Sequence, residues 1–129
     1  VGNFFEAVGL AFQIIDDVLN LRGFAGDLKQ RGEDLTQGKV TLPVARALGT
    51  LPLAQRRWLV DELRACTAES ERVEKMVAVI EDCGALEACS LQARALVEDG
   101  WKLLDPLVED SLPKLMMRAF GWYVLDRHY

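Results

Sequence analysis

The sequence predicts an all-α fold, and three observations lead to this prediction. Apolar residues recur at spacings of three and four along most of the 129 residues, which is the period of a buried helix face. No segment alternates apolar and polar residues in the way that is typical of a half-buried strand. There are no internal repeats or low-complexity tracts. Because half of the residues are hydrophobic, the chain can bury a core, and we expect residues 1–129 to form a single domain.

The first helix is expected from Phe4 to Leu21, with Asn3 as its N-cap, because apolar residues fill most of its circumference. Gly23 and Gly26 interrupt the pattern, so residues 22–39 are expected to form a loop. The remaining periodic segments end at glycine or proline and predict helices at 41–48, 52–65, 70–84, 85–104 and 112–127. Ser111 is expected to cap the last helix, whose inner face is predicted to carry Leu112, Leu115, Met116, Ala119 and Tyr123.

Composition excludes several classes of function. The net charge of −5 gives no electrostatic support for nucleic-acid binding. No apolar run reaches the length of a transmembrane segment, because Asp16 and Asp17 interrupt the longest one. Three cysteines without a Cys-x-x-Cys spacing indicate reduced thiols and a cytoplasmic location. The single histidine, His128, argues against a Ser-His-Asp triad and a histidine-rich zinc site.

A narrow polar stripe runs along the first predicted helix. On a helical wheel this stripe falls into one sector roughly 100° wide, and its members are Glu6, Gly9, Gln13, Asp16, Asp17 and Asn20. A helix that is apolar on its other faces is usually buried, so we expect the stripe in the interior or on a cavity wall. Two adjacent carboxylates there repel by about 4 kcal/mol at an effective dielectric of about 20. Solvent, a basic partner or a hard cation such as Mg²⁺ could relieve this repulsion; the alternative is a solvated acidic end of a surface helix.

The loop that follows contains a second informative segment, Gly32-Glu-Asp-Leu-Thr-Gln-Gly-Lys-Val-Thr-Leu-Pro43. Lys39 stands between a glycine and a predicted helix cap, so its ammonium group can reach an anion. Asp34 could position Lys39 or bind a metal-held water. Taken alone, the segment is better explained as an ordinary surface loop with a solvated lysine. Its place just after the paired aspartates favours a functional role, because carboxylates, Mg²⁺ and a lysine together can hold a diphosphate leaving group.

Both segments resemble motifs of one family. Phe12-Gln-Ile-Ile-Asp-Asp-Val-Leu-Asn20 is similar to the second aspartate-rich motif of the trans-isoprenyl diphosphate synthases, or polyprenyl synthetases. Gly32-x-Asp-x-x-x-Gly-Lys-x-Thr-Leu-Pro43 is similar to the segment that follows it in that family. The resemblance extends from about Phe4 to Ala47, and two motifs in the right order are more specific than either one. The family usually has Asp-Asp-x-x-Asp, whereas Asn20 takes the last place here. The family's lysine two positions before Gly32 is replaced by Gln30, beside Lys29.

The resemblance implies an isoprenoid synthase fold and Mg²⁺-dependent, head-to-tail condensation of an allylic prenyl diphosphate with isopentenyl diphosphate. Asp16 would bind Mg²⁺ directly, and Asp17 directly or through water. The implied metal ligands are Asp16, Asp17 and Asn20. The implied substrate contacts are Gln13, Lys39 and Thr41. Asp16, Asp17 and Lys39 are the implied catalytic residues.

One part of the family pattern is missing. Members need a first aspartate-rich motif on an earlier helix, but positions 16–17 hold the only Asp-Asp pair in this chain. The chain therefore resembles the C-terminal half of a synthase; we expect it to be inactive alone and to form homo-oligomers such as a dimer. Two alternatives remain open, a non-catalytic helical partner subunit of a synthase and a class I terpene cyclase. The cyclases usually spread Asn/Asp, Ser/Thr and Glu along the corresponding helix, which this chain does not match.

Overall fold

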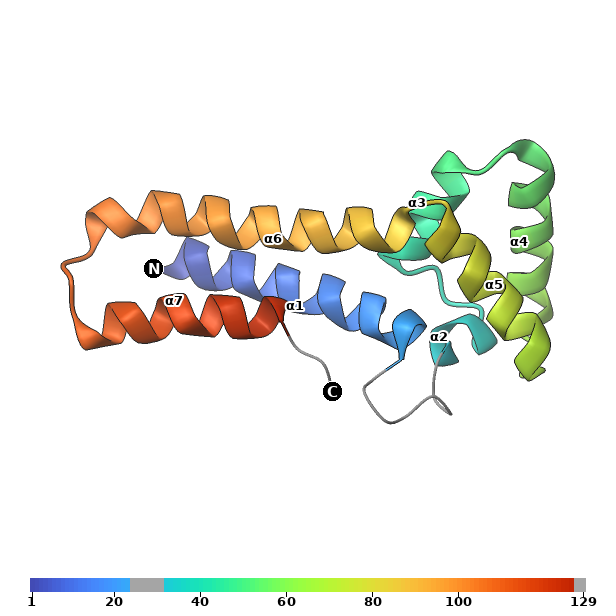
Figure 1. Ribbon diagram of the computed structural model, residues 1–129, viewed down its shortest axis with the longest axis horizontal. Coiled ribbons are helices and arrows are strands. Elements are labelled where there is room, and N and C mark those ends of the chain that lie inside the picture. Colours follow the sequence, from blue (N-terminus) through green and yellow to red (C-terminus); the bar gives the residue numbers. More distant parts are fainter. Residues whose placement is uncertain (24–31, 127–129) are drawn as a thin grey trace.

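A computed structural model describes residues 1–23 and 32–126, and within these two ranges the secondary structure is entirely helical (Figure 1). The predicted all-α class is therefore confirmed. The elements are α1 (Gly2–Arg22), α2 (Glu33–Thr36), α3 (Leu42–Thr50), α4 (Leu53–Ala65), α5 (Ser70–Asp82), α6 (Ala85–Leu104), the short 3₁₀ helix η2 (Asp105–Leu107) and α7 (Leu112–Leu125). Gly26, Lys29 and Gln30 of the predicted loop, together with His128, lie outside the described residues.

The helices form an elongated layer with a smaller group at one end. Helices α1, α6 and α7 lie side by side along the long axis, and α6 packs along the length of α1 (Figure 1). Helices α3, α4 and α5 gather where α1 ends and α6 begins, with α2 beside them. As predicted, the first helix contributes its apolar faces to the core. Its buried side chains are Phe4, Val8, Ala11, Ile14, Ile15, Val18, Leu19 and Leu21.

The N-terminal end of α1 is fitted closely between α6 and α7. The buried Phe4 ring packs edge-on against Trp101 of α6, with ring centroids 5.5 Å apart. Glycine provides the room on both neighbouring helices. A Cβ atom at Gly100 would lie 3.3 Å from the Ala7 Cβ, and one at Gly121 would lie 3.0 Å from a Val97 methyl group. Small residues at these contacts therefore allow the three helix backbones to approach one another.

Replacing Phe4 with alanine should lower the free energy of unfolding by about 3–5 kcal/mol, because it removes a fully buried ring from a close-packed site. Urea denaturation followed by circular dichroism measures this loss. The matched control is Phe5→Ala, one residue further along the same helix, where the side chain is 44% exposed. This control should change the stability by less than about 1 kcal/mol. Equal losses for the two variants would contradict the packing described here.

The inner face of α7 is not the one predicted. The helix itself was predicted correctly, but Leu112, Leu115, Met116 and Tyr123 are more than half exposed, and Ala119 is exposed as well. The residues that pack inward are Lys114, Met117, Arg118, Gly121, Val124 and Leu125. Because α7 is apolar around most of its circumference, periodicity could not identify the inner face. Two cations occupy that face, and a prediction based on hydrophobicity places cations outside.

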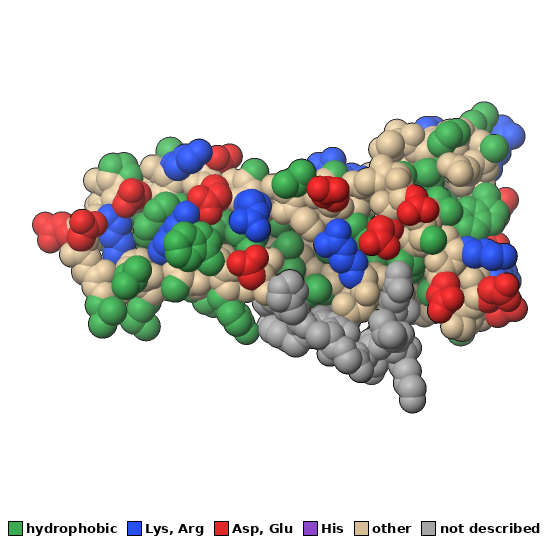
Figure 2. All heavy atoms as spheres, in the orientation of Figure 1, with side chains coloured by type: hydrophobic (Ala, Val, Ile, Leu, Met, Phe, Trp, Pro, Cys, Tyr) green, Lys and Arg blue, Asp and Glu red, His purple; other side chains and the backbone are tan. Residues whose placement is uncertain are grey.

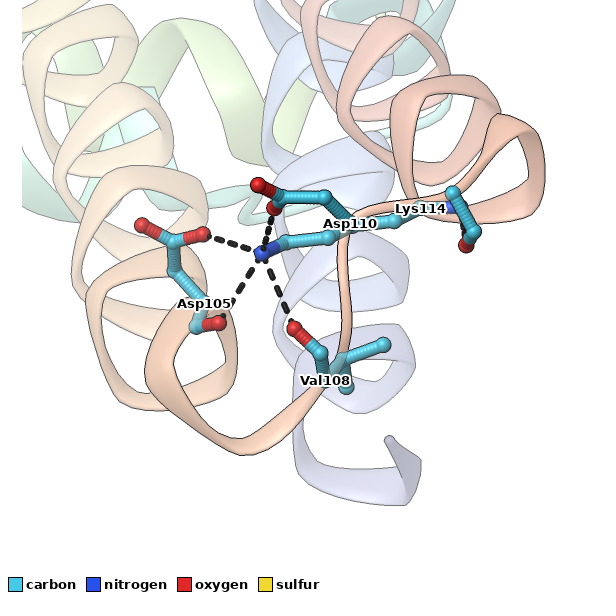
Figure 3. A network of polar contacts seen from close by, with 5 residues as sticks. Asp105, Val108, Asp110 and Lys114 are labelled. Atoms are coloured by element: carbon cyan, nitrogen blue, oxygen red, sulfur yellow. Dashed lines mark hydrogen bonds and ion pairs between the residues drawn. The ribbon is translucent and has the colours of Figure 1, made fainter.

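Ionic partners explain why these two cations can face inward. The Lys114 ammonium group donates to the backbone oxygens of Asp105 and Val108, both at 3.0 Å, and pairs with the carboxylates of Asp105 at 2.7 Å and Asp110 at 2.9 Å (Figure 3). The Arg118 guanidinium lies 2.7 Å from the Glu98 carboxylate and stacks over the ring of Trp122. Lys114 thus fastens the turn between α6 and α7, where backbone oxygens would otherwise lack donors.

The predicted caps of the first and the last helix have different outcomes. Asn3 lies within α1, which begins after Val1 and has no side-chain cap, so this prediction was wrong. Ser111 caps α7 as predicted, because its hydroxyl oxygen accepts a hydrogen bond from the Lys114 backbone N–H at 3.3 Å. In the described part of the chain, no helix combines the length and the hydrophobicity needed to cross a bilayer.

Exposed hydrophobic side chains gather on two helices. On α1 they are Phe5, Leu10 and Phe12, which flank the polar stripe, and on α7 they are Leu112, Leu115, Met116, Phe120, Trp122 and Tyr123. Figure 2 shows hydrophobic side chains protruding along the edge that α7 forms. Apolar surface of this extent on neighbouring helices is typical of a face that other protein covers.

Candidate functional site

The polar stripe of α1 lies on an open face of the helix, rather than in the interior or on the wall of an enclosed cavity. Gln13 and Asp16 are exposed, whereas Asp17 and Asn20 are half-buried where α2 and α3 approach. This difference in exposure along the stripe depends on which neighbouring segments cover it. The first part of the stripe has no covering helix among the described residues, and the last turn is covered by the segment that begins at Gly32. The two adjacent aspartates therefore have different surroundings.

Asp17 lies among other charges. Burial and the nearby carboxylates of Asp34 and Asp16 raise the pKa of Asp17 above its ordinary value. A hydrogen bond from the backbone N–H of Leu42 and the positive charge of Lys39 act in the opposite direction but do not cancel the rise. Three carboxylates and one ammonium group thus share this end of α1. The excess of negative charge favours a cation at this position.

Lys39 is held beside Asp34 by two contacts. Its ammonium group lies 3.6 Å from the Asp34 carboxylate, and its backbone N–H donates to the Asp34 carbonyl oxygen at 3.0 Å. The Lys39 side chain is 59% exposed, so its ammonium group can leave Asp34 for a stronger anion at little cost. Asp34 therefore contacts Lys39, as one of the two roles considered from the sequence requires.

Asn20 contacts the same segment from the last turn of α1. Its side-chain oxygen accepts a hydrogen bond from the Asp34 backbone N–H at 3.2 Å, and its backbone oxygen accepts one from the Gly32 N–H at 2.8 Å. Gly32 has a φ of 78°, which favours glycine. The structure also leaves no room for a side chain there, because a Cβ atom would lie 2.6 Å from a Val73 methyl group.

The structure brings together some of the predicted site residues and leaves others apart. Asp17, Asn20 and Lys39 meet around Asp34, and Asp16 is the neighbour of Asp17. Gln13 lies one turn earlier on the same open face, without a described contact to the Lys39 segment. Thr41 is half-buried at the N-cap position of α3, where its side chain makes no capping hydrogen bond.

Sequence analysis missed one residue behind the site. Cys89 of α6 is completely buried, and burial raises the pKa of its thiol, with the Asp17 charge adding to the rise and the Arg46 charge opposing it. The sequence contained no signal for this neighbourhood, because periodicity does not show which helices pack against each other. The high pKa keeps this thiol protonated and unreactive.

The oxygen donors at this end of α1 suit a hard cation such as Mg²⁺, which prefers carboxylate and carbonyl ligands and keeps several waters. The described side chains do not form a complete set of metal ligands by themselves. Among the residues that the structure describes, no three histidine, cysteine, aspartate or glutamate side chains are placed to hold a metal ion together. The donor chemistry therefore fits Mg²⁺.

The helical fold and this arrangement of carboxylates and lysine agree with the isoprenoid synthase fold that the resemblance implies. A sequence model of the family described as polyprenyl synthetase matches residues 1–80, and the chain belongs to this family. The predicted family is thereby confirmed. The match favours a synthase over the class I terpene cyclase that the sequence had left open.

Individual relatives agree with the family match. The chain is 32% identical over 126 residues to the (2E,6E)-farnesyl diphosphate synthase of Mycobacterium tuberculosis, covering 93% of this chain and 34% of the relative. It is 34% identical over 104 residues to an all-trans-nonaprenyl-diphosphate synthase of Rhodobacter capsulatus, covering 80% of this chain and 31% of that protein. The chain thus spans about a third of the length of these relatives.

Solved structures show the same relationship in three dimensions. A decaprenyl diphosphate synthase from Rhodobacter capsulatus superposes with a TM-score of 0.84 at 27% identity, covering 98% of this chain and 39% of that one. A geranylgeranyl pyrophosphate synthase from Bacteroides thetaiotaomicron superposes with a TM-score of 0.81 at 26% identity, covering 96% and 40%. The predicted isoprenoid synthase fold is confirmed by this agreement.

Proposed function

We propose that this chain is the C-terminal part of a prenyl diphosphate synthase, which joins an allylic prenyl diphosphate to isopentenyl diphosphate head to tail. The observation that carries the proposal is the meeting of Asp17, Asp34 and Lys39 at the end of α1. Farnesyl, geranylgeranyl and nonaprenyl synthases among the relatives support this class of reaction. Within such a synthase, residues 1–129 form one all-α unit.

The reaction demands stabilisation of a leaving diphosphate. The carbon–oxygen bond of the allylic substrate breaks, the diphosphate keeps the electron pair, and the double bond of isopentenyl diphosphate attacks the allylic cation. The cation that this attack forms then loses a proton, which the released diphosphate can accept, and a double bond is restored. Lys39 offsets negative charge on the diphosphate, because its exposed ammonium group can move from Asp34 to the substrate. Gln13 and Thr41 are the further substrate contacts in this scheme.

Asp16 and Asp17 would hold Mg²⁺, which neutralises diphosphate charge when it is bound. The metal requirement is supported by the oxygen donors and by the like charges that raise the pKa of Asp17. The further ligands belong to the part of a synthase that this chain does not span. We therefore expect the chain alone to be inactive.

Assembly and location follow from the surface and the thiols. The exposed hydrophobic faces of α1 and α7 favour association, and we propose a homo-oligomer, in the simplest case a dimer. Cys66, Cys83 and Cys89 are free thiols, which supports a cytoplasmic location.

An assay of the complete protein that contains this chain tests the proposal and separates it from its alternatives. Radiolabelled isopentenyl diphosphate is supplied with an allylic diphosphate and Mg²⁺, and the products are separated by length. A synthase forms a longer prenyl diphosphate only when both substrates are present. Release of a hydrocarbon from the allylic diphosphate alone would identify a terpene cyclase. Stimulation of an added synthase by an otherwise inactive protein would identify a non-catalytic partner subunit.

A further inference from the structure

We infer that Asn20 is a positioning residue: it holds the Gly32–Leu42 segment on α1 so that Lys39 faces the diphosphate, and it does not ligate metal. This inference rests on the proposed function for the role of Lys39. It differs from what the family motif implies for position 20, where a metal ligand was expected from the resemblance.

The first contact lies where the segment returns to α1. Asn20 accepts two backbone N–H groups at once, that of Asp34 at its side-chain oxygen and that of Gly32 at its backbone oxygen. Gly32 is in turn pressed against Val73 of α5, with no space for a side chain between them. The segment is thereby fixed between the end of α1 and α5, and the side-chain oxygen of Asn20 already takes part in this contact.

A second set of contacts links Asp34 to Lys39. Helix α2 is one turn long, and Lys39, three residues beyond its end, donates its backbone N–H to the carbonyl oxygen of Asp34 within it. The ion pair between the two side chains adds a further link. Because the unit is so short, displacement of the Asp34 backbone also displaces Lys39. The hydrogen bond from Asp34 to Asn20 therefore bears directly on where the ammonium group lies.

The far end of the segment is attached to the same helix one turn earlier. The Leu42 backbone N–H, at the start of α3, lies near enough to the Asp17 carboxylate to lower its pKa. Asp17 and Asn20 thus hold opposite ends of a segment whose middle carries Lys39. A helix with polar side chains at these two positions can present the lysine from a fixed base, as transition-state stabilisation requires.

The choice of an amide at position 20 follows from the charges nearby. An asparagine oxygen accepts a backbone N–H without adding negative charge to Asp16, Asp17 and Asp34, whose repulsion already acts on Asp17. A neutral amide oxygen is also a weaker ligand for Mg²⁺ than a carboxylate. Both considerations favour the positioning role.

Hydrogen exchange measured by mass spectrometry on the complete protein tests the inference without depending on catalysis. Asn20→Ala should increase the exchange rate of the Gly32–Lys39 amides by roughly tenfold, because one of the anchoring hydrogen bonds is lost. Asn3→Ala is the matched control, since it removes an exposed asparagine from the other end of the same helix, and it should leave those amides unchanged. Unchanged exchange in Asn20→Ala would overturn the inference.

A kinetic comparison with Asn20→Asp separates positioning from metal binding and remains informative if Asn20→Ala fails to fold. The side-chain oxygen of an aspartate can accept the same Asp34 N–H, so Asn20→Asp should keep normal exchange of the Gly32–Lys39 amides. Asn20→Ala should raise KM for the allylic diphosphate with the same Mg²⁺ dependence. A severalfold shift of the Mg²⁺ dependence in Asn20→Ala would identify a metal ligand, and faster exchange of the Gly32–Lys39 amides in Asn20→Asp would show that the side-chain hydrogen bond does not hold the segment; either result would overturn the inference. Protected amides in a protein without condensation activity would instead contradict the proposed function.

Discussion

Replacing Asp16 with alanine in the complete synthase should lower kcat/KM at saturating Mg²⁺ by about two to three orders of magnitude. Asp16 lies on the open face of α1 beside Asp17, so it is placed to meet ligands from outside the chain. On the proposed function, its loss would remove a carboxylate that holds Mg²⁺ beside the leaving diphosphate, where added negative charge in the transition state makes the cation most effective. The condensation assay with radiolabelled isopentenyl diphosphate measures the effect.

Cys83→Ala is the control for this prediction. Cys83 is half-buried at the end of α5, where its thiol contacts the Ile80 carbonyl oxygen, so its removal affects packing without touching the carboxylates. The control should retain kcat/KM within about twofold, because an alanine there leaves the charge at the site unchanged. Wild-type turnover by Asp16→Ala at saturating Mg²⁺ would contradict the assignment of Asp16.

The 129-residue chain alone should not condense prenyl diphosphates. Its described residues do not bring together three carboxylate, histidine or cysteine side chains for a metal ion, and about two-thirds of the length of its relatives is not represented. Activity should therefore be at background in the assay that detects the complete enzyme. Restoration of activity by adding the missing part as a separate chain would locate the remaining ligands there.

The same chain should associate with itself. Phe5, Leu10 and Phe12 on α1 are exposed, as are the hydrophobic side chains on the outer face of α7, and soluble monomers rarely expose contiguous apolar patches above roughly several hundred Å². Light scattering should give a mass of at least twice 14.4 kDa. A second copy could exchange helices to cover these faces. A monodisperse monomer that elongates prenyl diphosphates unaided would contradict both expectations.

The sequence predicted helices well because their signals are local. Apolar spacing and the boundaries marked by glycine and proline located the long helices to within one or two residues, for example α6 at Ala85–Leu104. The inner face of α7 could not be predicted in this way. Its orientation depends on ion pairs between Lys114 and two aspartates and on the stacking of Arg118, and these contacts exist only after the chain has folded.

The same distinction between local signals and long-range contacts applies to the candidate site. The motifs identified Asp16, Asp17, Asn20 and Lys39 as chemically important residues, and their roles as ligands remain predictions. The contact between Asn20 and Asp34 was not predictable, because fourteen residues separate them and periodicity says nothing about how a loop returns to its helix. The same is true of Cys89, which reaches the back of Asp17 from another helix.

The close packing of α1 at Gly100 and Gly121 also fixes the position of the carboxylates toward the other end of the helix. Phe4 and Asp16 are separated by about 18 Å along the axis, at about 1.5 Å per residue. Because a helix is stiff, a shift along its axis at one end moves the other end as well. The axial position that the Phe4 ring fixes therefore also fixes the axial position of Asp16. Since an error of about 1 Å at a reacting centre can cost about a hundredfold in rate, residues far from the diphosphate share control of its alignment.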